Sequence, residues 1–380
     1  MADVGLSGGR APARPDRLPT GRLARLPASP GFQAWAARVP LLRRLVRTEG
    51  EAMFDLVAGF CHSQILLALV RLRIPTLLLS HRMTAAALAA DTQVPPDRMQ
   101  VLLNAAVSLR LLKCRGGYYQ LTTRGTALAG VPGLQGMIDH HDVLYRDLTD
   151  PVAFFRGEVD TELADFWPYV FGAGGATDPD VTARYSRLMT DSQALVAADT
   201  IAAVNWSGAS HVMDIGGGTG AFLAALGQVV RTPHLTLFDL PAVAPAAAKR
   251  FADTGLLDRT TIAPGSFRDD PLPQGADVIT LVRVLYDHAD DTVLALLRAA
   301  FDALPPGGRL IVSEPMTGGQ APQRAGDAYF ALYCMAMRTG RARSATQVQA
   351  LMQQAGFAQF RAPKPHRPFV TSVVWGVRPS

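Results

Sequence analysis

The spacing of apolar positions changes along the chain and divides it into regions. From Glu51 to Leu72 the apolar residues recur at helical spacing. The next stretch, "MTAAALAADTQVPPDRMQVLLNAAVSLRLLKCRGGYYQLT", predicts two short helices followed by a hairpin that turns at its Gly-Gly pair. Thr84 is placed to cap the first short helix, and Pro95 and Pro96 mark the start of the second. This pattern is typical of a winged helix.

The second half of the chain has a different pattern. Residues from about Leu134 to Asn205 are predicted to be mainly helical, and the composition changes at Trp206. From Ser210 onward, helical runs alternate with short β-type runs, which read "HVMDIG", "LTLFDL", "TIAPGSF", "ADVITLVRVL", "GGRLIVSEP" and "RPFVTSVVWGV". Such alternation predicts crossover connections and an α/β fold with a doubly wound, mostly parallel sheet.

These patterns give four predicted regions. Residues 1–47 form a tail, residues 48–135 a winged-helix-type dimerisation domain, residues 136–205 a helical linker that covers substrate, and residues 206–380 the domain with the parallel sheet. The tail holds nine arginines against two aspartates, a formal net charge of +7, so the other 333 residues sum to −2. With few large apolar groups, the tail is expected to be flexible up to about residue 30. Its charge suits an anionic membrane surface, or it is a solvated leader with no partner.

Composition excludes several classes of protein. The three cysteines, Cys61, Cys114 and Cys334, are far apart, so they suggest neither a disulfide framework nor a metal site. Uninterrupted apolar runs, such as Ile65 to Val70, are far shorter than the roughly 18 residues that span a bilayer. We therefore expect a cytoplasmic protein that touches the inner or photosynthetic membrane at most peripherally.

Nucleic-acid binding is also disfavoured. The predicted second helix and wing carry only Arg98, Arg110, Lys113 and Arg115, diluted among leucines and alanines. A recognition helix needs clustered cations for phosphate contacts.

The strongest motif is "VMDIGGGTGAF", residues 212–222, in which an apolar strand turns through glycines into a helix. Glycines allow a tight turn and the close approach of a ligand to the backbone. Taken alone, the motif is ambiguous, because Gly216, Gly218 and Ala221 also satisfy the dinucleotide fingerprint.

Two further features favour S-adenosylmethionine over a dinucleotide. Asp214 comes two residues before the first glycine, where a carboxylate can meet a cationic ligand group and would repel a pyrophosphate. The next strand ends in "LFDLP", which places Asp239 where a carboxylate can bind both ribose hydroxyls of either ligand. The later order "PGSFRDDPLPQGADVITLVRVLYDHADD" and "LPPGGRLIVSEP" is the pattern of methyltransferase strands four and five.

The glycine motif, "FDLP", "GSF", "RVLYDHADD", "PGGRLIVSEP" and "AGF", in this order, resemble the small-molecule O-methyltransferases of the plant caffeate and bacterial polyketide type. The resemblance runs from about Glu51 to the C-terminus. Within that family, "GEAMFDLVAGFCHSQILLALV" and "RYSRLMTDSQALVAADT" are similar to the bacterial enzymes of acyclic carotenoids. The resemblance implies a homodimer that uses S-adenosylmethionine without a metal and methylates the tertiary hydroxyl of a hydrophobic carotenoid. An aromatic polyketide or phenolic acceptor is the alternative, and so is a member that binds the cofactor without methyl transfer.

The resemblance also implies site residues. Ser266 stands where many members have an aspartate that contacts adenine, and Phe267 can cover the adenine ring. The full set expected around the cofactor is Asp214, Gly216, Gly218, Gly220, Asp239, Leu240, Ser266, Phe267 and Arg283. Met189 matches a family methionine that sandwiches the acceptor. The other residues expected around the acceptor are His140, His141, Trp167, Tyr329 and Met335.

The catalytic base is an open question. Plant members take the acceptor's proton with the histidine of "LHDW", and the aligned position here is Tyr286, a poor base at neutral pH. His288 can take over that role. Alternatively, Tyr286 only orients the hydroxyl, and the proton leaves to solvent, His140 or His141. In a third interpretation Tyr286 packs against the cofactor and His288 caps the next helix.

Two acidic residues complete the catalytic candidates. Asp287 lies inside the same polar cluster. Glu314 ends strand five and matches the family glutamate that flanks the base. The second flanking glutamate of the family falls near Ala342 and is absent from this chain.

Overall fold

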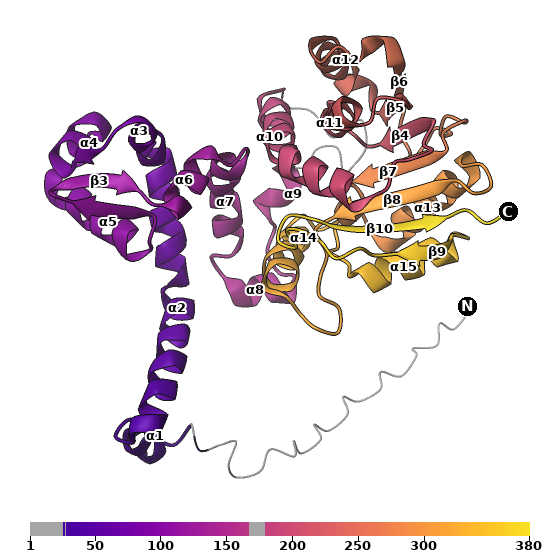
Figure 1. Ribbon diagram of the computed structural model, residues 1–380. Helices are drawn as coiled ribbons and strands as arrows, with labels where there is room; N and C mark the ends of the chain where they lie inside the picture. The colour runs from indigo at the N-terminus through magenta and orange to yellow at the C-terminus, as the bar shows by residue number, and fades with distance from the viewer. Residues whose placement is uncertain (1–25, 27, 167–178) are drawn as a thin grey trace, which may run out of the picture. The chain divides into compact units, whose positions relative to one another are not determined.

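The computed structural model describes residue 26 and residues 28–166 and 179–380, with side chains except at positions 41 and 166–188. It divides into two compact units, Met1–Leu66 and Leu67–Ser380. The first unit contains helix α1 (Pro30–Ala36) and most of α2 (Pro40–Arg71; Figure 1), and each helix begins with a proline. Residues 30–47, the second part of the tail, are therefore largely helical. Phe32 and Trp35 pack against each other within α1, at 5.7 Å between ring centroids.

Helix α2 is amphipathic, with large apolar side chains left exposed at Leu45, Val46, Met53, Leu56, Val57 and Phe60. Its stretch Leu42–Arg71 is long and apolar enough to cross a membrane, with a mean hydropathy of 1.7 over its best 18-residue window. Our prediction from uninterrupted apolar runs missed this property, because single polar residues such as Asp55 and His62 interrupt the run.

The second unit begins with the predicted winged helix. It comprises α3 (Ile74–Ser80), β1 (Met83–Thr84), α4 (Ala85–Thr92), α5 (Pro96–Ser108), β2 (Leu112–Arg115) and β3 (Tyr118–Leu121). The strands form an antiparallel sheet in the order β1-β3-β2. Thr84 caps α4 by accepting a hydrogen bond from the Ala87 amide at 3.2 Å. Gly116 and Gly117 make the hairpin turn with positive φ angles.

Helices follow, as predicted for the region from Leu134 to Asn205. They are α6 (Thr123–Gly130), α7 (Leu134–Asp147), α8 (Pro151–Arg156), α9 (Glu162–Phe166) and α10 (Pro179–Ala203).

The C-terminal half holds a seven-stranded sheet in the order β6-β5-β4-β7-β8-β10-β9. Its strands are β4 (His211–Ile215), β5 (His234–Asp239), β6 (Thr260–Pro264), β7 (Val278–Val282), β8 (Arg309–Glu314), β9 (Ala358–Arg361) and β10 (Ser372–Val377). The first five are parallel, and β10 runs antiparallel to both β8 and β9. The six predicted strands are confirmed. Strand β9 was not predicted, because it is short and only every second residue is even partly covered.

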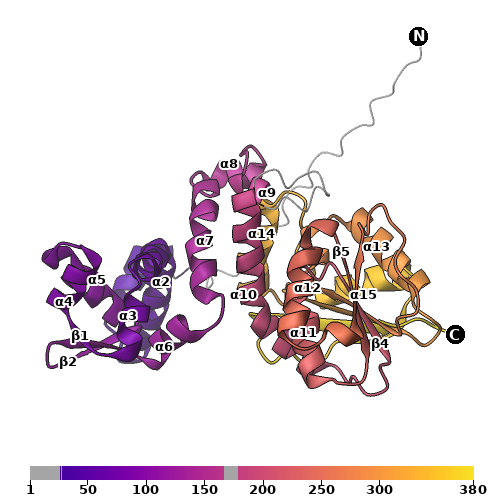
Figure 2. The same cartoon turned by 90° about the horizontal axis from the view of Figure 1, so that it is seen from above.

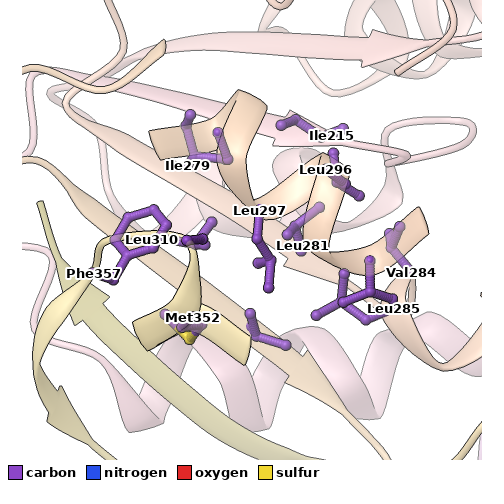
Figure 3. Close-up of a cluster of buried hydrophobic side chains, with 14 of the residues drawn as sticks. Ile215, Ile279, Leu281, Val284, Leu285, Leu296, Leu297, Leu310, Met352 and Phe357 are labelled. Carbon is purple, nitrogen blue, oxygen red and sulfur yellow. The ribbon is translucent and has the colours of Figure 1, made fainter. Parts of the chain in front are cut away.

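Helices cover both faces of this sheet (Figure 2). On one face, α13 (Asp290–Ala303) and α15 (Ala345–Gln354) enclose an apolar cluster that includes Ile215, Leu281 and Leu297, shown in Figure 3. On the other, α10, α11 (Ala221–Val229) and α12 (Ala244–Asp253) enclose a second cluster around Phe222 and Phe251. Strands buried on both faces explain why the sheet reads as continuous apolar runs. The predicted fold class is confirmed.

This topology positions the site. The segments that follow β4, β5, β6, β7 and β8 all leave the same edge of the sheet, because these strands are parallel. Ligands of doubly wound folds bind outside the carboxyl ends of the strands, where the strand order reverses. Here the reversal lies between β4 and β7.

Candidate active site

A pocket lies at this edge of the sheet, and ten of the predicted site residues line it. They are Met189, Gly216, Gly218, Asp239, Leu240, Ser266, Phe267, Arg283, Asp287 and His288. Thr190, Gln193, Thr219 and Arg268 also line it, and the sequence argument did not single them out.

The glycine turn after β4 forms one wall of the pocket. Gly216, Gly218 and Gly220 have φ angles of 68°, 57° and 73°, which disfavour any residue with a side chain. Gly217 is required for space: a Cβ there would lie 2.3 Å from Asp214 Oδ2 and 2.6 Å from Leu237 Cδ1. The turn is therefore a bare-backbone cradle open to the pocket.

We predict that Gly217→Ala weakens binding of S-adenosylhomocysteine about tenfold, because overpacking costs about 1–3 kcal/mol and the displaced groups support the cradle. Calorimetric titration measures the effect. Gly130→Ala is the matched control, since a Cβ at Gly130 would meet nothing within 4 Å. Unchanged affinity in Gly217→Ala would show that the turn does not contact the ligand.

Asp214 lies beneath this turn and is fully buried. Its Oδ1 accepts a hydrogen bond from the Thr280 hydroxyl at 2.6 Å, while Oδ2 has no partner among the described residues. Burial raises the pKa of Asp214 to about 8. Asp214 does not line the described pocket, and the contact with a cationic ligand group stays a prediction.

Asp239 ends β5 and connects the glycine turn to the segment that begins with Leu240. One carboxylate oxygen accepts a hydrogen bond from the Gly218 amide and the other from the Leu240 amide, both at 2.6 Å. Burial raises its pKa, and the two amide donors oppose the rise. The carboxylate thus fixes the glycine turn and faces the pocket.

Phe267 and His288 form another wall of the pocket. Their ring centroids are 5.4 Å apart, and the rings pack edge to face. Arg268 donates a hydrogen bond to His288 Nδ1 at 3.2 Å. Since a guanidinium only donates, Nδ1 carries the lone pair and Nε2 the hydrogen. Burial, with the positive charges of Arg268 and Arg343, lowers the pKa of His288 to about 4. His288 is therefore a neutral ring and a weak base.

Ser266, beside Phe267, donates its hydroxyl to Asp269 at 2.9 Å. At this position, where many members of the family that the sequence resembles have an aspartate, the chain thus has a hydroxyl that already donates to a neighbouring carboxylate.

The turn after β7, residues 283–288, carries the polar cluster of the sequence. Arg283 has a φ of 61°, a strained backbone for a residue with a long side chain. Its guanidinium donates to the Ser192 hydroxyl at 2.8 Å and to Met189 Sδ at 3.3 Å. This strained turn joins the end of β7 to helix α10.

Tyr286 lies in this turn but does not line the described pocket, and only 5% of it is exposed. Burial raises its pKa above the usual value, partly opposed by its hydrogen bond with Arg283. Its phenol is therefore protonated at physiological pH and cannot act as a base.

Glu314 is fully buried and Asp287 is partly buried, and each has one buried carboxylate oxygen with no partner among the described residues, Asp287 Oδ1 and Glu314 Oε1. Burial raises the pKa of Glu314 to about 8, against the positive charge of Arg343 and the amides of Leu285 and Tyr286. Burial also raises the pKa of Asp287 well above its usual value; Arg283 opposes the rise and Glu314 adds to it. Only Asp287 of the two lines the pocket.

A second polar network lies between helix α7 and the segment formed by η6 (Arg324–Phe330, a π-helix) and α14 (Ala331–Ala336). His140 Nε2 is 2.8 Å from the Tyr333 hydroxyl, and His141 Nε2 is 2.6 Å from the Tyr329 hydroxyl. Tyr333 was not predicted from the sequence, although it follows the predicted Tyr329 by four residues, about one turn of a helix.

Three other predicted residues fall elsewhere. Gly220 supports the turn from behind, where a Cβ would lie 2.5 Å from Phe251. Met335 is 47% exposed and does not line the described pocket, because it faces outward from α14. Trp167 lies outside the described residues. Within the described part of the chain, no group of three or more His, Cys, Asp or Glu residues could hold a metal ion.

The fold and the pocket together define a class I methyltransferase. A family model for the O-methyltransferase domain matches residues 145–358, and one for the O-methyltransferase dimerisation domain matches residues 54–130. The chain therefore belongs to the S-adenosylmethionine-dependent O-methyltransferases.

Relatives and solved structures agree with this family. The demethylspheroidene O-methyltransferase of Cereibacter sphaeroides is 55% identical over 98% of both chains. The enzyme of the same name from Rhodobacter capsulatus is 50% identical over 96% of this chain and 91% of its own. Aclacinomycin 10-hydroxylase RdmB of Streptomyces purpurascens is 33% identical over 76% of this chain and 79% of its own. The crystal structure of human N-acetylserotonin methyltransferase has a TM-score of 0.75 at 24% identity and covers 87% of this chain and 98% of that one.

Proposed function

We propose that this enzyme transfers a methyl group from S-adenosylmethionine to the tertiary C1 hydroxyl of an acyclic hydroxycarotenoid. The observation that carries the proposal is the 55% identity, over 98% of both chains, to a protein named demethylspheroidene O-methyltransferase. Expression in a bacterium that accumulates the hydroxycarotenoid and lacks its own methyltransferase tests it. The proposal expects the methoxy carotenoid in pigment extracts, and an unchanged pigment profile would count against it.

The pocket suits S-adenosylmethionine. The cradle at Gly216–Gly218 leaves room that a Cβ would fill, and Asp239 presents a carboxylate to the pocket. We assign Asp239 to the ribose hydroxyls, Leu240 and Phe267 to the adenine, and the glycine turn to the methionine portion. When bound, the cofactor supplies an electrophilic methyl group on a sulfonium.

We assign the acceptor's proton to Asp287. The other candidates are weaker: the Tyr286 phenol is protonated, and His288 has a pKa of about 4 with Nδ1 held by Arg268. Asp287 lines the pocket and has a raised pKa, which makes it the stronger base when ionised. Since a tertiary alcohol does not ionise in the ground state, the proton moves to Asp287 as the new C–O bond forms.

Two alternatives have specific support. An aromatic acceptor is favoured by relatives named for naphthoate methylation, at 28–32% identity. A reaction without methyl transfer is favoured by the relative named as a hydroxylase. The first predicts methyl ethers of phenols only, and the second predicts binding of S-adenosylmethionine with no S-adenosylhomocysteine formed.

We infer a homodimer that uses the apolar face of α2. The match to the dimerisation domain begins at residue 54 and includes exposed Leu56, Val57 and Phe60. Contiguous exposed apolar side chains of this kind mark a surface that contacts another protein or a membrane. The arginines that precede it, among them Arg43, Arg44 and Arg47, suit peripheral contact with an anionic membrane on its cytoplasmic side, where a polyene acceptor would reside.

We predict that Phe60→Glu converts the dimer to a monomer, because it places a charge in the buried interface. Light scattering after size exclusion measures the mass. Phe60 is 71% exposed in the single chain, so the chain itself should fold. Glu51→Gln, at an exposed position of α2 before the matched segment, is the control and should remain dimeric. A wild-type monomer, or a dimeric Phe60→Glu, would contradict the inference.

A further inference from the structure

The carbonyls of four consecutive residues in the turn after β7, 285–288, accept hydrogen bonds from one segment, residues 339–343. The contacts are Arg343 Nη1 to Leu285 O at 2.9 Å, the Arg341 amide to Tyr286 O at 2.8 Å, the Thr339 hydroxyl to Asp287 O at 3.1 Å, and Arg343 Nη2 to His288 O at 2.8 Å. We call this segment the carbonyl clamp. It holds the backbone of the turn that carries Asp287, because all four contacts are made to backbone carbonyls.

Arg343 makes two of these four contacts and is only 2% exposed. Its Nε donates to Asp290 Oδ1 at 2.8 Å, at the first residue of α13. One planar guanidinium therefore connects Leu285 and His288 of the turn to Asp290 at the start of the next helix. A lysine could not reproduce this arrangement, because its ammonium is a single point rather than a fork.

The clamp also fits the turn sterically. A Cβ on Gly340 would lie 2.6 Å from Tyr286 O and 3.5 Å from Cys334 Cβ. Cys334 belongs to α14, the helix that also carries Tyr333. At Gly340 there is thus no room for a side chain between α14 and the turn.

We propose that Arg343 is a positioning residue that sets the place of Asp287 for proton transfer, with the carbonyl clamp as its means of action. The inference rests on the proposed function for the role of Asp287. The second flanking glutamate of the family falls near Ala342, which directly precedes Arg343. This chain lacks that glutamate but has the arginine that follows it. Arg343 does not line the described pocket.

Arg343→Lys tests the proposal against Arg341→Ala. Arg341 pairs with the same Asp290 by an exposed ion pair, but its contribution to the clamp is a backbone amide that alanine retains. We expect Arg343→Lys to lower kcat at least tenfold, with the KM for S-adenosylmethionine and the Kd for S-adenosylhomocysteine within threefold of wild type. Arg341→Ala should keep kcat within threefold.

Amide hydrogen exchange gives a readout that needs no acceptor. In Arg343→Lys, exchange should rise in the peptide that covers residues 283–290 and stay unchanged in the glycine turn. Gly340→Ala, which presses on Tyr286 O from the clamp, should give the same local rise and a lower kcat. If the wild type fails to methylate the carotenoid but exchange responds in this way, the proposed function fails and the clamp stands.

Two results would overturn the proposal. In one, Arg343→Lys matches Arg341→Ala in kcat and in exchange. In the other, Arg343→Lys lowers cofactor affinity and raises exchange throughout the sheet, which is the signature of general destabilisation.

Discussion

Replacing Asp287 by asparagine should lower kcat by roughly 10²–10⁴-fold, the contribution typical of a positioned general base. Asparagine has nearly the same shape, and the backbone contact of Asp287 O with Thr339 does not depend on the carboxylate. The Kd for S-adenosylhomocysteine, whose sulfur is uncharged, should stay within threefold. Single-turnover methyl transfer measures the chemical step directly.

The pH profile gives the same test independently. The base works when ionised, so kcat/KM should fall as the pH falls through the pKa of Asp287, which burial holds above the usual carboxyl range. Asp287→Asn should remove this inflection. His288→Gln is the matched control, and because His288 has a pKa of about 4, we expect kcat to change by less than tenfold. A larger loss in His288→Gln than in Asp287→Asn would assign the proton to His288 instead.

Replacing Asp239 by alanine should weaken S-adenosylhomocysteine binding at least 100-fold. The carboxylate presents two acceptors, and hydrogen bonds to a charged group contribute about 1.5–3 kcal/mol each. The change also frees the Gly218 and Leu240 amides, which now donate to it at 2.6 Å. Calorimetric titration measures the loss.

Asp239→Asn is the matched variant, because its amide keeps one of the two acceptors. We expect an affinity between those of wild type and Asp239→Ala. If Asp239→Ala bound S-adenosylhomocysteine as tightly as wild type, the pocket at the end of β4 and β5 would not be the cofactor site.

The fold was predictable because its determinants are local. Alternating helical and β-type runs give the parallel sheet, and the positions of Thr84 and of the Gly-Gly pair give the winged helix. The assignment of residues 30–47 to the tail has a different cause: it followed the positive charge of the first 47 residues, whereas Pro30 and Pro40 begin two helices there. Charge density is a weak guide to structure where apolar residues repeat at helical spacing.

The candidate site was predictable in its glycine turn and in Asp239, where a single chemistry explains the residue types. It was less predictable where partners come from distant segments. The pairing of Arg268 with His288, which adds to the effect of burial in lowering the pKa of that histidine, joins the segments after β6 and β7, and no local sequence pattern predicts it. Asp214 occupies the expected position in sequence, but it is buried beneath the turn and does not line the pocket, which no local pattern predicts.

The same holds for the carbonyl clamp. Its donors follow α14, some 50 residues after the carbonyls they bind, and half of them belong to one arginine in an arginine-rich stretch. In the sequence that stretch is notable for a missing glutamate, and the function of its arginine becomes apparent only from the contacts.

The central claim is methylation of a carotenoid alcohol, and the most direct measurement supplies purified enzyme with methyl-labelled S-adenosylmethionine. The acceptors are hydroxylated acyclic carotenoids in detergent, with a panel of phenols beside them. The account predicts a labelled methyl ether of the carotenoid and stoichiometric S-adenosylhomocysteine. Labelled ethers of phenols, with none from the carotenoid, would contradict the acceptor while leaving the family assignment intact.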